Sequence, residues 1–334
     1  MSWRRPPSAA YAAVVVAFAA VFRSAGEWNE RLAIPPVDGQ ILAAQSSGEE
    51  SEEGSGARVT QRIRKDGGIH SAEYGFLNFN QDRISVSYKL DDADFRTYDG
   101  SFGYRTEDLD DLKKWRDNAR KSAFQVAVKT GKSQAQLDTA VATVDKEYDK
   151  KLLDYMRSKG FRMEKGGVVR VDMPQIVRNN GPLIKSLALT FERLATQRRY
   201  RSTDIIGAAL SFVQTALHYR QPDPVYKGKH TGGLLPPITA VLLGWGDCDT
   251  KTALLASLLS NWVQMRMVGI SVPGHYLMAV LQIPDKGDMF VEHQGLQYVL
   301  VEPAGPAWLP PGRVAEETVN ELNAREGYKI EPFF

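Results

Sequence analysis

A cysteine, a histidine and a glutamate follow one another along the chain in an order that suits nucleophilic catalysis. Cys248 is the only cysteine among the 334 residues, so it cannot form a disulfide within the chain. It lies in the string GDCD (246–249), directly ahead of an apolar run with helical spacing, which predicts a sulfur in the first turn of a helix. In that position unpaired backbone N–H groups and the positive end of the helix dipole favour a thiolate.

His275 and Glu302 supply the two further groups that a thiol nucleophile needs. His275 follows a Pro-Gly pair and begins an alternating run, which predicts a histidine at the mouth of a strand, and Glu302 directly follows the apolar run 296–301. Taken singly, such a histidine is more often a surface turn residue, and such a glutamate marks where a chain reaches the surface. If the two strands pair, however, Glu302 can fix the tautomer and orientation of the ring. The three groups are then nucleophile, base and orienting carboxylate.

Cys248 has a structural alternative, because an unpaired cysteine is commonly a small inert core residue. Three features favour reactivity: Asp247 and Asp249 flank it, it opens a helix, and it is an unpaired thiol in a chain for which export is predicted below. The two carboxylates raise the pKa of the thiol, so we expect a nearby imidazolium to hold the thiolate. The backbone N–H of Cys248 is a natural oxyanion donor, and Trp245 either walls the acyl site or packs against the sheet.

The elements around these residues predict an α+β fold for residues 166–334. Helical patterns occupy roughly 182–199 and 203–218, and a polar loop then leads to the helix of Cys248. Three predicted strands follow, at 267–271, 276–283 and 296–301. Helices first and strands afterwards predict an antiparallel sheet packed on the nucleophile helix.

Two smaller parts precede this domain. Alternating apolar and polar residues predict a small β-region with one wet face over 58–105. Residues 106–165 predict an α-helical hairpin, with Thr106 as an N-cap and Ser133 with Gln136 as a capping box at the second helix. The charged faces of the hairpin are more typical of a solvated surface than of a partner site.

The N-terminus predicts export. Arg4 and Arg5 precede an apolar stretch at 9–22, which is the order of a signal peptide, so residues 1–25 are a signal peptide or an N-terminal membrane anchor. The stretch is short for a membrane span of ~20 residues, but its end is a poor cleavage site. A buried N-terminal helix is the alternative. Residues 26–57 are predicted to be a flexible, acidic, Ser/Gly-rich linker, which leaves the body of the protein exported, in the periplasm or cell envelope.

The composition narrows the class of partner. A formal charge of +2 and 25% charged residues give no field to steer nucleic acid. The histidines and the lone cysteine form no repeat with the spacing of metal ligands, so neither a metal nor another cofactor is expected.

Residues 212 to about 314 resemble the bacterial transglutaminase-like domain, within the papain-like cysteine-enzyme superfamily. The resemblance is carried by Phe212-Val213-Gln214, Tyr219, the run 235–242, the GDCD string, Gly274-His275, the strand ending in Glu302, and Trp308 to Gly312. It implies that Cys248 is the nucleophile, His275 the base and Glu302 the acidic third member. It also offers Gln214 as a side-chain donor to the oxyanion, whereas a polar place on the outer face of a helix is at least as good an interpretation of that residue.

The chain departs from the family at two positions. Thr250 stands where a second acidic residue is usual after the cysteine, and Glu302-Pro303-Ala304 replaces an Asp-Pro-Thr context. The resemblance implies attack of the thiol on a peptide or protein amide in the cell envelope, through a thioester that water, in preference to an amine, resolves. The alternative is a catalytically silent fold of this type that serves as a binding or scaffold module through the hairpin and the β-region.

Overall fold

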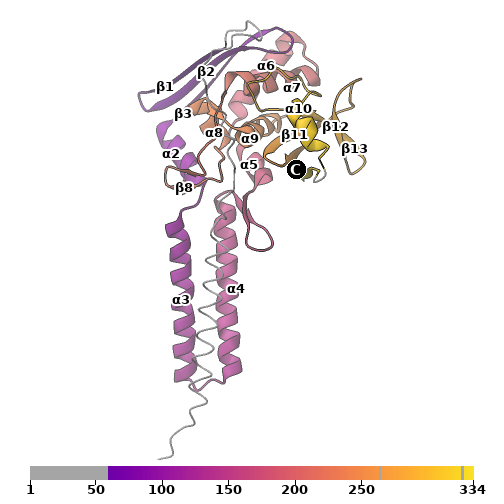
Figure 1. Ribbon diagram of the computed structural model, residues 1–334. Helices are drawn as coiled ribbons and strands as arrows, with labels where there is room; N and C mark the ends of the chain where they lie inside the picture. Colours follow the sequence, from indigo (N-terminus) through magenta and orange to yellow (C-terminus); the bar gives the residue numbers. More distant parts are fainter. Residues whose placement is uncertain (1–58, 263–264, 325–326) are drawn as a thin grey trace, which may run out of the picture. The chain divides into compact units, whose positions relative to one another are not determined.

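The computed structural model describes residues 59–262, 265–324 and 327–334 (Figure 1). The predicted signal or anchor (1–25) and linker (26–57) lie outside the described residues. In the described part of the chain, no helix combines the length and apolarity that crossing a membrane requires. Residues 59–161 and the described residues from 171 to 334 form one compact unit, of which 162–170 are not part. By themselves, residues 162–170 form a turn in which the Glu164 N–H donates to the Val168 carbonyl.

The predicted β-region is an antiparallel sheet of three strands, ordered β1-β2-β3. Its strands are β1 (Thr60–Asp66), β2 (Ile69–Leu77) and β3 (Arg83–Asp91). The rest of the predicted β-region differs from the prediction, since α2 (Asp92–Ser101) is a helix. Along β3, Ile84, Val86 and Tyr88 are buried and their neighbours are exposed, so the expected wet face is confirmed. The buried face is tied to the helical core, since the Tyr74 hydroxyl donates to the Val241 carbonyl.

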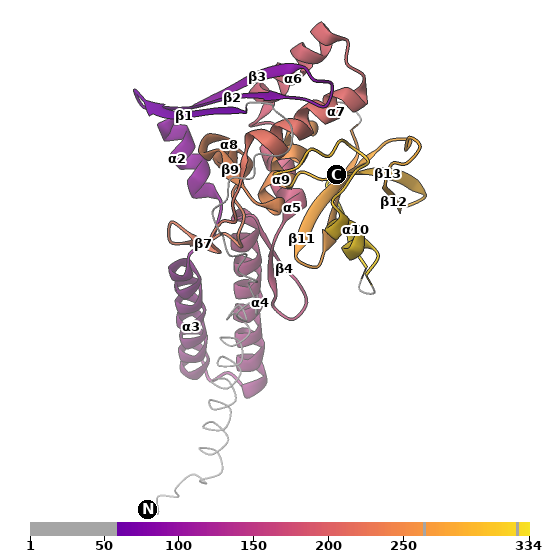
Figure 2. The ribbon, with the colours of Figure 1, turned by 45° about the horizontal axis from the view of Figure 1, so that its top comes forward.

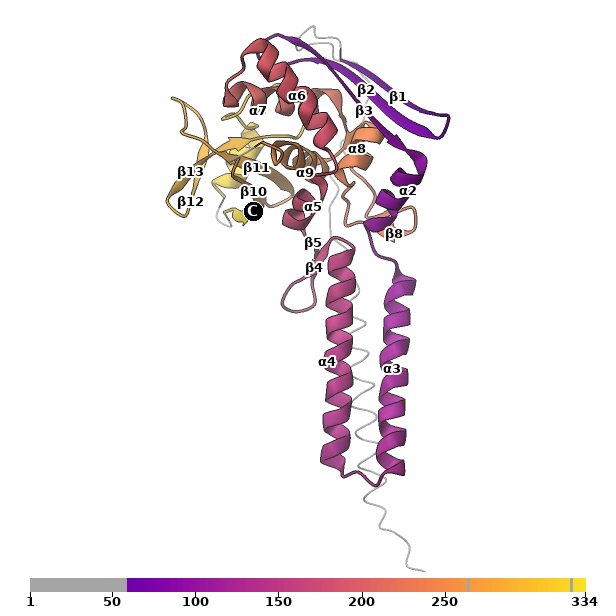
Figure 3. The same cartoon turned by 180° about the vertical axis from the view of Figure 1, so that it is seen from behind.

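The predicted hairpin consists of α3 (Thr106–Lys129) and α4 (Gln134–Ser158), which lie side by side (Figure 3). The capping box of Ser133 and Gln136 is confirmed. The N-cap prediction for Thr106 is wrong by one residue, because the cap is Arg105 and Thr106 opens the helix. The Thr106 hydroxyl is instead hydrogen-bonded to Nε2 of His230 at 3.0 Å.

The helical core surrounds the helix that begins at Cys248. Its elements are α5 (Met173–Asn180), α6 (Lys185–Arg198), α7 (Ser202–Ser211), the π-helix η1 (Phe212–Ala216), α8 (Pro237–Leu243) and α9 (Cys248–Leu259). Helix α9 packs against α5, α7 and α8, so it lies at the centre of the unit (Figure 2). The predicted helix at 203–218 is therefore wrong in its last turn, where the chain widens into a π-turn before Leu217 becomes extended.

The large sheet has five antiparallel strands in the order β12-β13-β11-β10-β14. Its strands are β10 (Met267–Val272), β11 (His275–Leu281), β12 (Phe290–His293), β13 (Leu296–Val301) and β14 (Lys329–Pro332), and α10 (Glu316–Leu322) precedes β14. The three strands expected from the sequence are present, whereas β12 and β14 were not predicted. The mixed α+β class with antiparallel sheets is thus confirmed.

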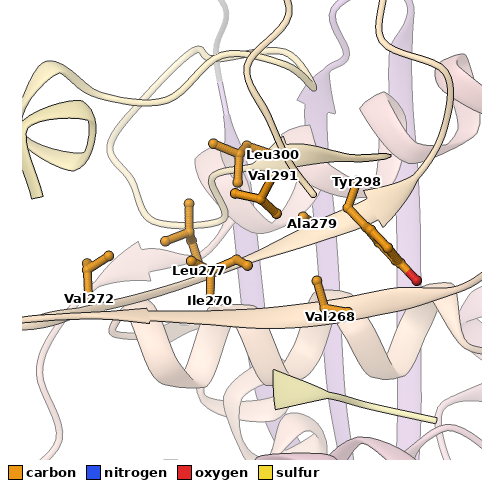
Figure 4. Close-up of a cluster of buried hydrophobic side chains, with 8 residues drawn as sticks. All are labelled: Val268, Ile270, Val272, Leu277, Ala279, Val291, Tyr298 and Leu300. Carbon is orange, nitrogen blue, oxygen red and sulfur yellow. The ribbon is translucent and has the colours of Figure 1, made fainter. Parts of the chain in front are cut away.

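One face of this sheet carries an apolar cluster (Figure 4). Its members are Val268, Ile270, Val272, Leu277, Ala279, Val291, Tyr298 and Leu300, and Leu322 of α10 packs against them. Alternate residues such as Met278 and Val280 are equally buried and point to the opposite face, where α9 packs on β11. The Thr252 hydroxyl of α9 donates to the Tyr276 carbonyl at 3.1 Å, which fixes the helix on the strand.

The remaining strands are short. They are β6 (His218–Tyr219), β7 (Val225–Tyr226), β8 (Lys229–His230) and β9 (Trp245–Gly246), while β4 (Phe161–Met163) pairs with β5 (Val169–Val171). Strand β6 runs parallel to β9, with Tyr219 opposite Gly246. Because Gly246 is two residues before Cys248, this pairing brings β6 beside the helix start.

Phe212 joins the β-region to the helical core. Its ring contacts Tyr74 at 5.2 Å, Phe76 at 5.6 Å and Phe191 at 6.0 Å between centroids, and none of it is exposed. We predict that Phe212→Ala lowers the free energy of unfolding by about 3–5 kcal/mol, because it removes a fully buried aromatic ring and leaves a cavity. Urea denaturation followed by circular dichroism measures this loss.

Phe124→Ala is the matched control, since that ring lies on α3 and is 44% exposed. It should cost less than about 1 kcal/mol. Equal losses for the two variants would contradict the role assigned to Phe212.

Candidate active site

Cys248 is the first residue of α9, as the sequence predicts. Asp247 is the N-cap, and its carboxylate accepts the N–H of Thr250 at 3.1 Å. Asp249 is in the first turn, and its Oδ1 accepts a hydrogen bond from the thiol of Cys248, with 3.6 Å between Sγ and Oδ1. The thiol therefore stands at the positive end of a helix, where the backbone N–H of Cys248 has no acceptor within the helix.

Pairing between β11 and β13 brings His275 and Glu302 together. Met278 is opposite Val301, so continuing the register by one residue places Glu302 opposite Leu277, on the same face as His275. Nε2 of His275 lies 3.0 Å from each carboxylate oxygen of Glu302. The other ring nitrogen is Nδ1, and among the described residues no hydrogen bond joins it to the thiol of Cys248.

The carboxylate of Glu302 is buried, with a side-chain exposure of only 3%. Besides His275 it accepts hydrogen bonds from the Thr318 hydroxyl at 3.0 Å and from the Ala304 N–H at 3.3 Å. A buried charge needs such partners. Together they hold the carboxylate in one orientation, and they therefore also fix the plane of the imidazole.

The thiol of Cys248 is only 9% exposed, and its pKa is raised above the ordinary value. Burial is the largest cause, and the charges of Asp249 and Asp247 add to it, while the backbone N–H groups of Tyr276 and Asp249 partly oppose it. The helix start therefore does not by itself yield the thiolate that its position favours. The resting group is a neutral thiol whose proton must be taken by a base.

The neighbouring ionisable groups respond to the same environment. Burial, followed by the charge of Asp247, raises the pKa of Asp249 to about 6. Burial by itself would lower the pKa of His275, but the hydrogen bond to Glu302 and the charges of Glu302, Asp249 and Asp247 outweigh it, so that pKa is raised. A protonated ring at this place is thus favoured.

Gln214 lies in η1 and is 1% exposed. Its Nε2 donates to the carbonyls of Glu302 at 2.5 Å and Leu309 at 3.0 Å, and its Oε1 accepts the N–H of Leu309 at 3.2 Å. Both amide hydrogens are therefore committed to backbone carbonyls, which differs from the expected role as an oxyanion donor. In this structure the side chain is a clamp on the segment that follows β13.

Trp245 is half-buried in β9, three residues before Cys248. The guanidinium of Arg220 lies over its ring, 4.5 Å from the centroid. Beside it, burial and then the charge of Cys248 raise the pKa of Tyr219 to about 12. Tyr219 is opposite Gly246 and Trp245 directly precedes Gly246, so both residues lie next to the helix start.

Two further residues near the site, Thr318 and Lys251, were not predicted from the sequence. Thr318 reaches Glu302 from α10, and nothing in the local sequence signals that contact. Lys251 is fully buried in α9, and burial lowers its pKa to about 8. Its position shortly before the apolar run 253–259 could have indicated a buried lysine. A charged side chain on a buried helix requires specific partners.

Two cavities of the described residues lie elsewhere. One of about 210 Å³ is lined by residues such as Asn78, Arg201 and Pro311, and one of about 450 Å³ lies on the hairpin beside Trp115 and Tyr155. None of Cys248, His275 or Glu302 lines either cavity. In the same part of the chain, no group of three or more histidine, cysteine, aspartate or glutamate side chains is arranged to hold a metal ion.

Comparisons of the chain with protein-family models, with curated proteins and with solved structures gave no significant match.

The geometry of His275 and Glu302 predicts the titration of the ring. We expect the His275 imidazole to titrate above its ordinary pKa of about 6.5, and Glu302→Gln to bring the pKa below that value, because burial stays while the partner charge is lost. The chemical shift of ¹³Cε1-labelled histidine measures both. The raised pKa adds stability that is complete below about pH 6.5 and is lost as the pH rises through the folded-state pKa.

Glu292→Gln is the control, because Glu292 is an exposed carboxylate on β12. The His275 titration should not move in that variant. A His275 pKa that is the same with Glu302 and with Gln at that position would contradict the pairing.

Proposed function

We propose that this protein is a thiol-dependent enzyme of the transglutaminase-like type, which attacks peptide or protein amide bonds through a thioester. Cys248 is the nucleophile, His275 the base and Glu302 the orienting carboxylate. The observation that carries the proposal is the pair of 3.0 Å contacts between Nε2 of His275 and Glu302, on a strand whose next residue, Tyr276, contacts the helix of Cys248. A helix-start thiol packed on such a strand is also the core arrangement that the resemblance implies.

The chemistry follows from the neutral thiol. As an amide carbonyl approaches, the Sγ–H proton passes to Nδ1 of His275 and an Sγ–C bond forms. The resulting oxyanion accepts a hydrogen bond from the backbone N–H of Cys248. The C–N bond then breaks, and the leaving amine takes the proton from the ring. Water next attacks the thioester, gives its proton to His275, and the Sγ–C bond breaks as the proton returns to sulfur. An amine in place of water would give transfer instead of hydrolysis.

Glu302 supports both steps without exchanging a proton itself. Its contacts with Nε2 stabilise the imidazolium that forms when the thiol is deprotonated. The hydrogen bonds from Thr318 and Ala304 keep the carboxylate in place while the ring changes charge. This support matters more at a thiol of raised pKa, because the proton transfer then starts uphill.

A second function has a specific observation in its favour. Cys248 is 9% exposed, and the pKa of its thiol is raised, which is typical of an inert cysteine. In this alternative the fold is a catalytically silent scaffold in the cell envelope, and the hairpin and the β-region bind the partner. The intact set of thiol, imidazole and carboxylate favours the enzyme.

We predict that Cys248→Ala abolishes turnover and that Glu302→Gln lowers kcat by about 10²–10⁴-fold with the fold retained, because the ring loses its orienting partner. Turnover should rise with pH through the raised pKa of His275, since only the neutral ring accepts the thiol proton. Labelled casein measures hydrolysis, a fluorescent primary amine measures transfer, and a peptide vinyl sulfone followed by mass spectrometry maps the reacting residue.

The same variants decide between enzyme and scaffold in a cell that lacks the protein. Failure of Cys248→Ala to restore the lost phenotype supports the enzyme. Full restoration by that variant, together with failure when residues 106–160 are deleted, would establish the scaffold.

We also propose that the protein is exported, on the strength of the basic and apolar order of residues 4–22. We predict that alkaline phosphatase fused after residue 57 is active, because that reporter folds only in an oxidising compartment. Replacing Arg4 and Arg5 by glutamate is the control and should lower the activity. A fusion that is inactive while a cytoplasmic reporter at the same position is active would exclude export.

A further inference from the structure

The π-turn η1 ends in a cluster of carbonyls that several distant segments reach. Helix ends leave their last carbonyls without partners in the helix, and here Gln61 of β1 donates to the Ala216 carbonyl at 3.0 Å. Gly305 packs against the Gln214 carbonyl so closely that a Cβ there would collide with it. The end of η1 is therefore a junction between the β-region, the nucleophile helix and the segment after β13.

Lys251 is the residue of the nucleophile helix at this junction. Its Nζ donates to the carbonyls of Leu217 at 2.8 Å and Gln214 at 3.4 Å, and its side chain is completely buried. A cation at a helix C-terminus is electrostatically favourable, and the charge of Asp247 opposes the effect of burial. Lys251 thus joins the first turn of α9, three residues beyond Cys248, to the backbone of Gln214.

The side chain of Gln214 continues the connection toward Glu302. Nε2 of Gln214 donates to the Glu302 carbonyl, and two further hydrogen bonds join the same amide to Leu309. These contacts hold the backbone of Glu302 where β13 ends, at the residue whose carboxylate orients His275. Gln214 therefore accepts a hydrogen bond from Lys251 at its backbone carbonyl, and its side chain donates to the backbone carbonyl of Glu302.

We infer that Lys251 and Gln214 are positioning residues, which together set Glu302 and His275 in register with the helix that carries Cys248. The inference deepens the proposed function and rests on it for its catalytic meaning. It assigns Gln214 to the orientation of the acid–base pair rather than to the oxyanion, and it gives the buried lysine a role. Neither residue touches the reacting atoms.

The titration of His275 tests the inference, because it reports how well Glu302 is held. In Gln214→Met and Lys251→Met we expect the pKa of His275 to fall by about 0.5–1 unit toward that of Glu302→Gln, since the carboxylate is held less well while the ring stays buried. For Lys251→Met the sign is decisive. Loss of a nearby positive charge alone would raise the pKa of His275, whereas loss of positioning lowers it.

Matched controls come from the same two helices. Thr215→Val removes the hydroxyl of η1 that donates to the Ser211 carbonyl. Ser257→Ala removes the buried hydroxyl of α9 that donates to the Ala253 carbonyl. Both should leave the His275 titration unchanged. Thermal unfolding checks that each variant is folded, and the uncharged variants Gln214→Asn and Lys251→Gln are used where a methionine variant does not fold.

The outcomes separate this inference from the proposed function. An unchanged or raised His275 pKa in folded Gln214 and Lys251 variants overturns the positioning role, even if turnover depends on Cys248. A lowered pKa supports it even in a protein that proves to be silent. If a Gln214 variant loses turnover while the His275 titration is unchanged, the result would favour Gln214 as a hydrogen-bond donor to the oxyanion.

Discussion

The burial of one carboxylate constrains the whole site. Glu302 is 2% exposed, and a charge so far from water is tolerated only where hydrogen bonds and an opposite charge replace its hydration. His275, Thr318 and the Ala304 N–H supply these from β11, α10 and the segment after β13. The position of three separate elements is therefore coupled to a single side chain, and His275 lies on β11, the strand on which α9 packs.

Electrostatics at Cys248 is a balance between local and tertiary effects. A helix start favours a thiolate, whereas burial and the carboxylates of Asp247 and Asp249 disfavour it more strongly. The same carboxylates help to raise the pKa of His275. Burial thus favours a neutral thiol at Cys248, while Glu302 and the neighbouring carboxylates favour a protonated ring at His275.

The β-region and the helical core form a continuous structure with this site. Phe212 packs among aromatic rings of β2 and α6, and the π-turn it opens ends in the junction reached by Gln61 and Lys251. A π-helix has a wider turn, with i→i+5 hydrogen bonds. Within η1 the Gln214 amide donates to the Glu302 carbonyl. The β-region is thus linked to the site through backbone contacts.

The local features of the site could be predicted from the sequence. Helical spacing after Cys248, strand alternation before and after His275, and the run ending at Glu302 predicted where each group lies within its element, because such patterns depend only on neighbours along the chain. The contacts of each group, in contrast, depend on how distant segments fold together. The strand register places His275 next to Glu302, and α10 supplies the hydroxyl of Thr318 to the same carboxylate. Burial raises the pKa of Cys248. Gln214 and Lys251 are buried too, and their side chains donate to backbone carbonyls. These effects arise from residues far apart in the chain, so no local pattern contains them.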